Sequence, residues 1–158
     1  MTAGTARVER LSESDWRVFA GVRLRALTDS LGERDPQYQR EVAFTAAQWR
    51  RRLRDHAQFA ALIDDRPVGL IGAQQEDVDT VYLYSLWLDP SARGHGLART
   101  LVAAGVDWAR GRRAWTVKLR VAVDNSVARG VYESLGFAVL PVENASPRDE
   151  VAMSLSVT

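Results

Sequence analysis

Hydrophobic and polar positions repeat with two different periods along the chain, and these periods predict its helices and strands. Apolar and polar residues alternate at 6–11, which predicts a first strand. From a capping-box pattern at 12–15, apolar residues recur at helical spacing to about Ser30, which predicts a helix. We expect the segment SLGERDPQYQ, with Gly32 and Pro36, to break this helix.

The middle of the chain predicts a short helix and then three strands. Thr45 and Gln48 form a second capping box, and the helix that it starts is expected to end near His56. Short runs rich in apolar, β-branched and aromatic residues follow, separated by the turn sequences DDRP and DVD. The three strands are expected to form an antiparallel meander at 58–64, 68–76 and 80–88.

The last third alternates between the two periods. We expect a helix at 96–110, a strand at 116–123, a helix at 126–135, and strands at 137–142 and 150–157, with a loop at 143–149. The order is strand, helix, helix, three strands, helix, strand, helix and two strands. Strand–helix–strand units imply parallel neighbours joined by right-handed crossovers. The predicted fold is therefore α/β, with a mixed sheet of about seven strands flanked by four helices.

Composition narrows the possible chemistry. The 158 residues suit a single domain over 1–158, and a net charge of +1 does not favour a nucleic-acid partner. The chain has no Cys and two His, so we expect no disulfide, no cysteine nucleophile and no metal site. No apolar run approaches the length of a membrane span, and residues 1–10 lack the apolar core of a signal peptide. We therefore expect a cytoplasmic protein without a membrane partner.

The loop DPSARGHGLARTL, at 89–101, carries the first candidate site. It joins the strand at 80–88 to a helix whose first turn is rich in glycine. Unpaired amides and the helix dipole attract anions to such a helix start. Small residues at Gly94, Gly96 and Ala98 let a phosphate approach the backbone, and Arg93 adds positive charge. A plain glycine-rich turn is the alternative.

The segment DNSVARGVYESLGF, at 124–137, carries the second candidate site. Asn125 and Tyr132 are seven residues apart, so they lie on nearly the same helix face. A helix cap and a core aromatic are their structural interpretations. Both candidate helices follow strands expected to be parallel neighbours, so both helix starts are expected at the same sheet edge, where ligands of open α/β sheets commonly bind.

Together the two segments resemble the GCN5-related N-acetyltransferases (GNAT). The family pattern Arg/Gln-x-x-Gly-x-Gly/Ala is similar to Arg93–Ala98, and its Asn followed by Tyr-x-x-x-Gly-Phe is similar to Asn125 and Tyr132–Phe137. These motifs lie between about Tyr82 and Phe137, and the order of elements resembles the family over the whole chain.

The resemblance implies acetyl-CoA as co-substrate, held where the strand at 80–88 separates from the strand at 116–123. It implies that main-chain groups near the end of the first strand hold the pantetheine arm, that the loop holds the pyrophosphate and that Asn125 contacts the pantetheine region. The implied cofactor-binding residues are Leu86, Trp87, Leu88, Arg93, Gly94, His95, Gly96, Leu97, Ala98 and Asn125.

The resemblance also implies direct transfer of the acetyl group to a primary amine, with Tyr132 as general acid. Many relatives carry a Glu on the strand before the loop as general base, and here that strand has none. Our hypothesis is a water-relayed base, with the water held by Tyr84 or Ser85. An acid in the segment that follows the first helix is the alternative base.

The amine that accepts the acetyl group is open among a small amine, an antibiotic amine and a peptide amine. Glu33, Glu41 and Tyr82 are candidate substrate-binding residues, and aromatic and acidic residues would favour a cationic amine. A non-catalytic acyl-CoA-binding sensor or interaction module is the alternative function. A homodimer paired through the C-terminal strands is possible.

Overall fold

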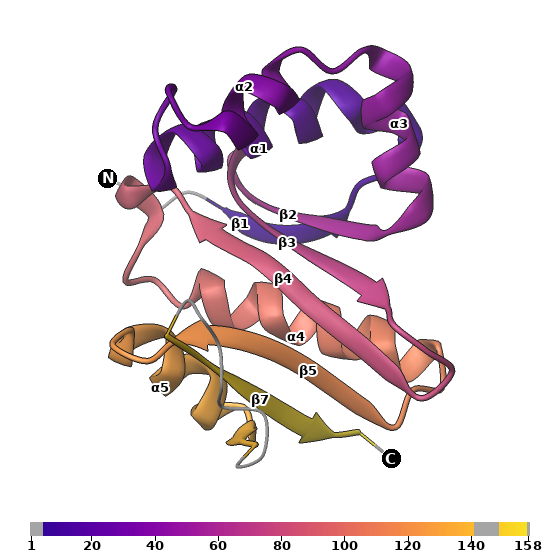
Figure 1. Ribbon diagram of the computed structural model, residues 1–158, viewed down its shortest axis with the longest axis vertical. Coiled ribbons are helices and arrows are strands. Elements are labelled where there is room, and N and C mark those ends of the chain that lie inside the picture. Colours follow the sequence, from indigo (N-terminus) through magenta and orange to yellow (C-terminus); the bar gives the residue numbers. More distant parts are fainter. Residues whose placement is uncertain (1–4, 141–148, 158) are drawn as a thin grey trace.

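The strands form one mixed sheet around which the helices are arranged (Figure 1). The computed structural model describes residues 5–140 and 149–157. Within them, seven strands follow the order β1-β2-β3-β4-β5-β7-β6. Their bounds are Ala6–Arg10 (β1), Ala57–Ile63 (β2), Arg66–Gln75 (β3), Thr80–Leu88 (β4), Thr116–Ala122 (β5), Ala138–Val139 (β6) and Glu150–Ser156 (β7). The meander of β2, β3 and β4 and the parallel pairing of β4 with β5 are both confirmed.

Helices cover both faces of the sheet. They are Trp16–Ser30 (α1), Pro36–Val42 (α2), Ala46–Asp55 (α3), Leu97–Gly111 (α4) and Ser126–Ser134 (α5), with 3₁₀ turns at Glu13–Asp15 (η1) and Pro90–Ala92 (η2). In Figure 1, α1, α2 and α3 gather on one side of the sheet, and α4 lies against the other. The fold is thus the expected mixed α/β arrangement.

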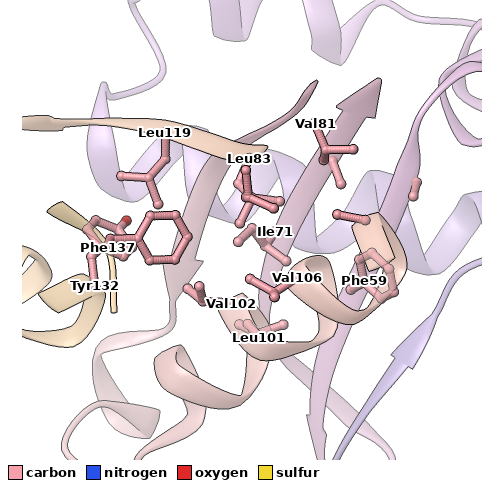
Figure 2. Close-up of a cluster of buried hydrophobic side chains, with 14 of the residues drawn as sticks. Phe59, Ile71, Val81, Leu83, Leu101, Val102, Val106, Leu119, Tyr132 and Phe137 are labelled. Atoms are coloured by element: carbon pink, nitrogen blue, oxygen red, sulfur yellow. The ribbon is translucent and has the colours of Figure 1, made fainter. Parts of the chain in front are cut away.

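The core has two layers because both sheet faces are covered. On the α4 face, Leu101 and Val102 pack with Ile71 and Leu83 in a cluster that also takes in Tyr132 (Figure 2). On the opposite face, apolar residues of α1 and α3 pack with residues of β3 and β4, among them Phe19, Trp49, Leu53, Leu70 and Trp87. Adjacent strand residues such as Leu70 and Ile71 therefore enter different clusters, as strand alternation requires.

The sequence prediction missed α2. It treats Pro36 as a breaker, whereas the structure begins a helix there. Asp35 precedes α2 as its N-cap and accepts a hydrogen bond from the Gln37 amide at 2.8 Å. Proline at the first helical position loses no hydrogen bond and already has a helical φ. The described residues therefore contain five α-helices where four were expected.

An irregularity in β4 positions the candidate site. Between the pairs Gly72↔Tyr84 and Leu70↔Trp87, β4 contains one residue more than β3. Ser85 lies within this bulge with φ at +58°, a left-handed value that costs a non-glycine residue energy. The bulge turns Trp87 toward the α1 face, where it joins the cluster of Phe19 and Trp49.

The strands β4 and β5 pair only at their beginnings. Thr80, Val81 and Tyr82 pair with Thr116, Val117 and Lys118, and no later pair between the two strands follows. Along its other edge, β5 pairs with β7 over its whole length, from Thr116 to Ala122. In Figure 1, β4 and β5 diverge toward their C-terminal ends. The expected separation of these strands is present.

Strand β6 covers Ala138–Val139, so Phe137 and Leu140 of the expected strand at 137–142 are not part of it. Residues 141–148, which include the end of that expected strand and most of the expected loop, lie outside the described residues. Strand β7 agrees with the expectation to within one residue. Among the helices of the described part, none is long and apolar enough to cross a membrane.

Candidate functional site

A cavity of about 250 Å³ opens where β4 and β5 diverge. We call it the splay cavity. Its wall comes from β3, β4, β5, α5 and β7, and the residues are Ile71, Leu83, Tyr84, Ser85, Leu86, Leu119, Arg120, Val121, Ala122, Asn125, Ala128, Tyr132 and Glu150. The divergence leaves main-chain edges of β4 and β5 facing this space, as the resemblance led us to expect. Glu150 is an acid at this cavity that the sequence analysis did not identify.

Tyr132 reaches the splay cavity from the core side of α5. The residue is 6% exposed, and its ring meets Phe137 edge-on at a centroid distance of 6.0 Å (Figure 2). Its hydroxyl makes no hydrogen bond with the described residues. It is also not one of the polar atoms in this part of the chain that are both buried from solvent and without a hydrogen-bond partner. Burial, with a smaller effect of Tyr82, raises the pKa of Tyr132 to about 12. At neutral pH the group therefore carries a proton and faces the cavity without a hydrogen-bond partner among residues 5–140 and 149–157.

Asn125 starts α5 and also lines the splay cavity. Its Oδ1 accepts a hydrogen bond from the Ala128 amide at 3.1 Å, so it is the N-cap of the helix. The structural interpretation of this residue is thus correct, and its place in the wall is compatible with a contact to a ligand.

The loop before α4 presents its main chain openly. Gly94 and Gly96 have φ values of +85° and +80°, and a Cβ at either position would meet nothing within 4 Å. Glycine is therefore favoured by the backbone conformation and not by crowding within the chain. His95 is exposed. Gly96 caps α4 without a side-chain hydrogen bond, so the first amides of the helix, including those of Leu97 and Ala98, have no intrahelical acceptor.

Arg93 was expected to add positive charge beside a phosphate, but its guanidinium is also bound within the protein. Its Nε donates to the Leu88 carbonyl oxygen at 3.1 Å, and its Nη2 donates to Asp29 Oδ2 at 3.0 Å. Asp29 also accepts from Trp87 Nε1 at 2.9 Å. The carboxylate offsets part of the Arg93 charge, and the two contacts attach the loop to β4 and α1.

The three β4 residues expected to hold a pantetheine arm divide between the two sheet faces. Leu86 lines the splay cavity, whereas the buried Trp87 side chain packs toward α1. Leu88 packs into the α4-side core. Of these three side chains, only that of Leu86 is in the wall of the splay cavity.

A second cavity, of about 390 Å³, lies on the other side of β4, beneath α1, α2 and α3. We call it the arginine cavity. It is lined by Phe19, Arg23, Gln37, Arg51, Arg52, Asp55, His56, Gln58, Leu70, Tyr84 and Ser85. Tyr84 and Ser85, at the bulge, line both cavities. The irregular segment of β4 is therefore the part of the chain that the two spaces share.

Tyr84 is held by two neighbours in the arginine cavity. Its hydroxyl lies 2.5 Å from His56 Nδ1 and accepts a hydrogen bond from Gln58 Nε2 at 2.8 Å. Burial raises the pKa of Tyr84, and burial, with a smaller effect of Arg52, lowers the pKa of His56. Gly72 makes room for the tyrosine, since a Cβ there would come within 2.4 Å of the ring. The pair is thus a neutral imidazole beside a protonated phenol.

Glu41, one of the expected substrate-binding residues, is buried and is not among the residues that line either cavity. It is 1% exposed, and it accepts hydrogen bonds from Arg23 Nε at 3.0 Å, Arg52 Nη1 at 2.8 Å and Gln37 Nε2 at 3.1 Å. Burial alone would raise the pKa of Glu41, and Arg23 together with the other partners lowers it. The carboxylate is ionised and accepts hydrogen bonds from three side chains, so it orients two arginines of the cavity wall.

The other expected substrate-binding residues lie elsewhere. Glu33 is exposed, and its carbonyl oxygen accepts a hydrogen bond from Gln39 Nε2. Tyr82 is half-buried and stacks on Tyr84 at a centroid distance of 6.3 Å. Neither lines the splay cavity or the arginine cavity. In the described part of the chain, no group of three or more His, Asp or Glu side chains is arranged to hold a metal ion.

Sequence reasoning missed Arg23, Arg52, His56 and Gln58. A signal existed for two of them. Arg23 stands four residues after the buried Phe19 and four before the buried Leu27, so it occupies the apolar face of α1. Gln58 interrupts the apolar run of β2 and is 3% exposed. A polar residue at a buried position needs a partner, which marks both as candidates.

Comparison with known proteins agrees with this geometry. A mycothiol acetyltransferase of Rhodococcus erythropolis is 36% identical over 98 residues, which are 57% of this chain and 33% of that protein. One from Nocardiopsis dassonvillei is 38% identical over 97 residues, 60% of this chain and 26% of that protein. The chain thus spans about a third or less of the length of these relatives.

Solved structures share the fold at low identity. The PaiA N-acetyltransferase of Thermoplasma acidophilum, in complex with coenzyme A, has a TM-score of 0.75 and 17% identity, and the match covers 97% of this chain and 99% of that one. The ribosomal-protein-S18-alanine N-acetyltransferase of Escherichia coli has a TM-score of 0.71 and 20% identity, with 98% and 95% covered. The family model for the acetyltransferase (GNAT) family matches residues 22–137, and the chain belongs to that family.

Proposed function

We propose that this chain is an acetyl-CoA-dependent N-acetyltransferase that transfers the acetyl group directly to a primary amine. The observation that carries the proposal is the bulge of β4, where Tyr84 and Ser85 line both the splay cavity and the arginine cavity. A thioester on one side and an amine on the other would meet there. The acetyltransferase relatives support the activity, although the chain covers only part of their length. We further propose that residues 1–158 work as one catalytic domain in the cytoplasm.

The residues of the splay side fit coenzyme A. The uncapped start of α4 offers amides to a pyrophosphate, and the open space above Gly94 and Gly96 lets it approach. The splay cavity offers main-chain edges of β4 near Leu86, the side chain of Asn125 and the free hydroxyl of Tyr132. In this proposal Arg93 acts first as an anchor of the loop, through Asp29 and Leu88, and second as a charge near the phosphates.

Acetyl-CoA supplies the acetyl group as a thioester: the amine nitrogen forms a bond to the carbonyl carbon, and the carbon–sulfur bond breaks. Two proton movements must accompany this exchange, because the amine loses a proton and the departing sulfur gains one. Tyr132 is the proposed donor to the sulfur. It is protonated at neutral pH, since its pKa is about 12, and within the described part of the chain its hydroxyl has no hydrogen-bond partner to displace.

The pair formed by Tyr84 and His56 is the proposed route for the proton of the amine. The amine gives its proton to Tyr84 Oη, directly or through a water, while Tyr84 passes its own proton to His56 Nδ1 at 2.5 Å. The pKa of His56 is lowered, so the imidazole is neutral and able to accept. This route replaces the missing strand carboxylate and makes the predicted water relay more specific.

Acetyl-CoA binding and turnover are tested separately. Acetyl-CoA is expected to raise the melting temperature, and a panel of primary amines is expected to release CoA thiol above the rate of hydrolysis. The chain has no Cys, so a thiol reagent reports CoA alone. Binding without turnover on any amine would favour the alternative, a non-catalytic acyl-CoA sensor. Absence of any thermal shift with acetyl-CoA or CoA would overturn both functions.

A further inference from the structure

The arginine cavity has a charge pattern that the sequence did not predict. Three arginines line it, Arg23 from α1 and Arg51 and Arg52 from α3, against one lining acid, Asp55. The buried Glu41 behind the wall adds a second negative charge. Positive charge still exceeds negative charge around this space, whereas the sequence analysis expected acids that attract a cationic amine.

The two inner guanidinium groups are fixed in place. Arg23 holds Glu41 through Nε at 3.0 Å and Nη2 at 3.3 Å, and Arg52 Nη1 donates to the same carboxylate at 2.8 Å. A guanidinium has five N–H donors, so each arginine keeps donors that these contacts do not use. A preorganised, partly buried fork of this kind suits a carboxylate or phosphate.

The fixed charge lies close to the proposed reaction centre. Arg23 Nη1 donates to Ser85 Oγ at 3.1 Å, and Ser85 lines both cavities at the bulge. An anionic group on the arginines and an amine beside Ser85 and Tyr84 would therefore belong to one small molecule. The same positive charge favours the uncharged form of the amine, which is the form that attacks.

The apolar residues of the arginine cavity indicate what the rest of that small molecule is like. Phe19 and Leu70 are buried apolar residues that line the cavity, and they offer a surface to an apolar side chain. We propose that the arginine cavity binds a small primary amine that carries a carboxylate within a few bonds, such as an amino acid with an apolar side chain. This inference rests on the proposed N-acetyltransferase function and names the class of its amine substrate.

The test compares matched amines in the thiol-release assay. Each apolar amino acid is assayed beside its amide and its decarboxylated amine, for example leucine, leucinamide and 3-methylbutylamine. The amide has the larger uncharged fraction near neutrality, so its intrinsic reactivity works against the expected result. We expect kcat/KM to be at least about tenfold higher for the carboxylates, the ratio expected for a hydrogen bond to a charged group.

Variants locate the preference. Arg52→Gln and the exposed Arg51→Gln are expected to raise KM for the carboxylates about tenfold and to leave the amides unaffected. Arg50→Gln is the matched control, because Arg50 lies over the Trp16 ring and does not line the cavity. For each variant, CoA should first be shown to raise the melting temperature by the same amount as for the wild type. An unchanged shift indicates that the proposed CoA site at the splay cavity is intact.

Amides or amines that are acetylated as well as the carboxylates would overturn this inference and leave the proposed function standing. Equal losses in Arg50→Gln and Arg51→Gln would overturn it as well. If no amine of any class releases thiol, the proposed function fails, and this inference fails with it.

Discussion

The two cavities that meet at the bulge of β4 are built from different parts of the chain. Apart from Arg120 and Glu150, the wall of the splay cavity consists of uncharged residues, and its proposed ligand contacts are largely main-chain groups, with the free hydroxyl of Tyr132 added. The arginine cavity depends on long charged side chains that buried Glu41 holds in place. A main-chain site suits a ligand that a whole family shares. A side-chain site is free to differ from one relative to the next.

The contrast predicts different responses to substitution. At the splay cavity, removal of the Tyr132 hydroxyl should impair chemistry and leave the fold intact, because that hydroxyl makes no hydrogen bond with the residues that the structure describes. On the arginine side, removal of the Glu41 charge should destabilise the fold, because this buried carboxylate accepts hydrogen bonds from two arginines.

Tyr132→Phe should have the largest effect. We expect turnover to fall about 10²- to 10⁴-fold, the usual contribution of a general acid, with little change in CoA affinity or melting temperature. The phenylalanine ring keeps the packing against Phe137. Tyr38→Phe is the matched control, since Tyr38 lies in α2 and lines neither cavity. Steady-state kinetics and CoA titration measure the two quantities, and equal turnover in the variant would remove the acid role.

Glu41→Gln should destabilise the fold by about 3–5 kcal/mol, because it leaves two arginine charges near the core without their carboxylate. Urea unfolding measures the loss. Glu33→Gln, at an exposed position, should change stability by no more than about 0.5 kcal/mol.

The contribution of the Glu41 carboxylate to stability should depend on pH in a definite direction. The folded-state pKa of Glu41 is lowered from 4.5, so its stabilising effect is present above that value. The effect is lost as the pH falls through the lowered folded-state pKa, and wild type and Glu41→Gln should then converge. A stability difference that stays constant down to strong acid would contradict the assignment.

The difference between the two sides also explains how much the sequence could predict. Gly94, Gly96 and the cap at Asn125 are local signals, because a left-handed φ or a helix start is encoded within a few residues. They allowed the loop and the family to be anticipated. Tyr132 follows from the same helix by its spacing from Asn125.

The arginine cavity offered no comparable signal. Arg23, Glu41 and Ser85 are brought together by contacts between residues 18 and 62 positions apart. The register shift that places Ser85 at the bulge depends on pairing with β3. Helix α2, which carries Glu41, was itself read as a break at Pro36. Long-range pairing of this kind leaves no spacing pattern, so the sequence did not indicate that arginines line this cavity.

The route of the amine proton is tested by a pair of variants at its two ends. Tyr84→Phe and His56→Gln should each lower turnover about 10- to 100-fold. The double variant should turn over no more slowly than the less active of the two single variants, because the two groups act as a unit. The pKa of His56 is lowered below 6.5, so the ratio of wild-type to His56→Gln rates should stay constant above neutrality and approach one in acid. Losses that multiply in the double variant would rule out a shared route.

Gly94→Ala should have the smallest effect, and it separates backbone strain from ligand contact on the splay side. A residue with Cβ at φ +85° costs about 1–2 kcal/mol of stability, although the added atom meets no part of the protein. Gly111→Ala is the matched control at the end of α4, where φ is not left-handed, and it should cost nothing. If CoA occupies the space above the loop, its affinity for Gly94→Ala should fall by more than partial unfolding explains. Unchanged affinity in the folded variant would place the phosphates elsewhere.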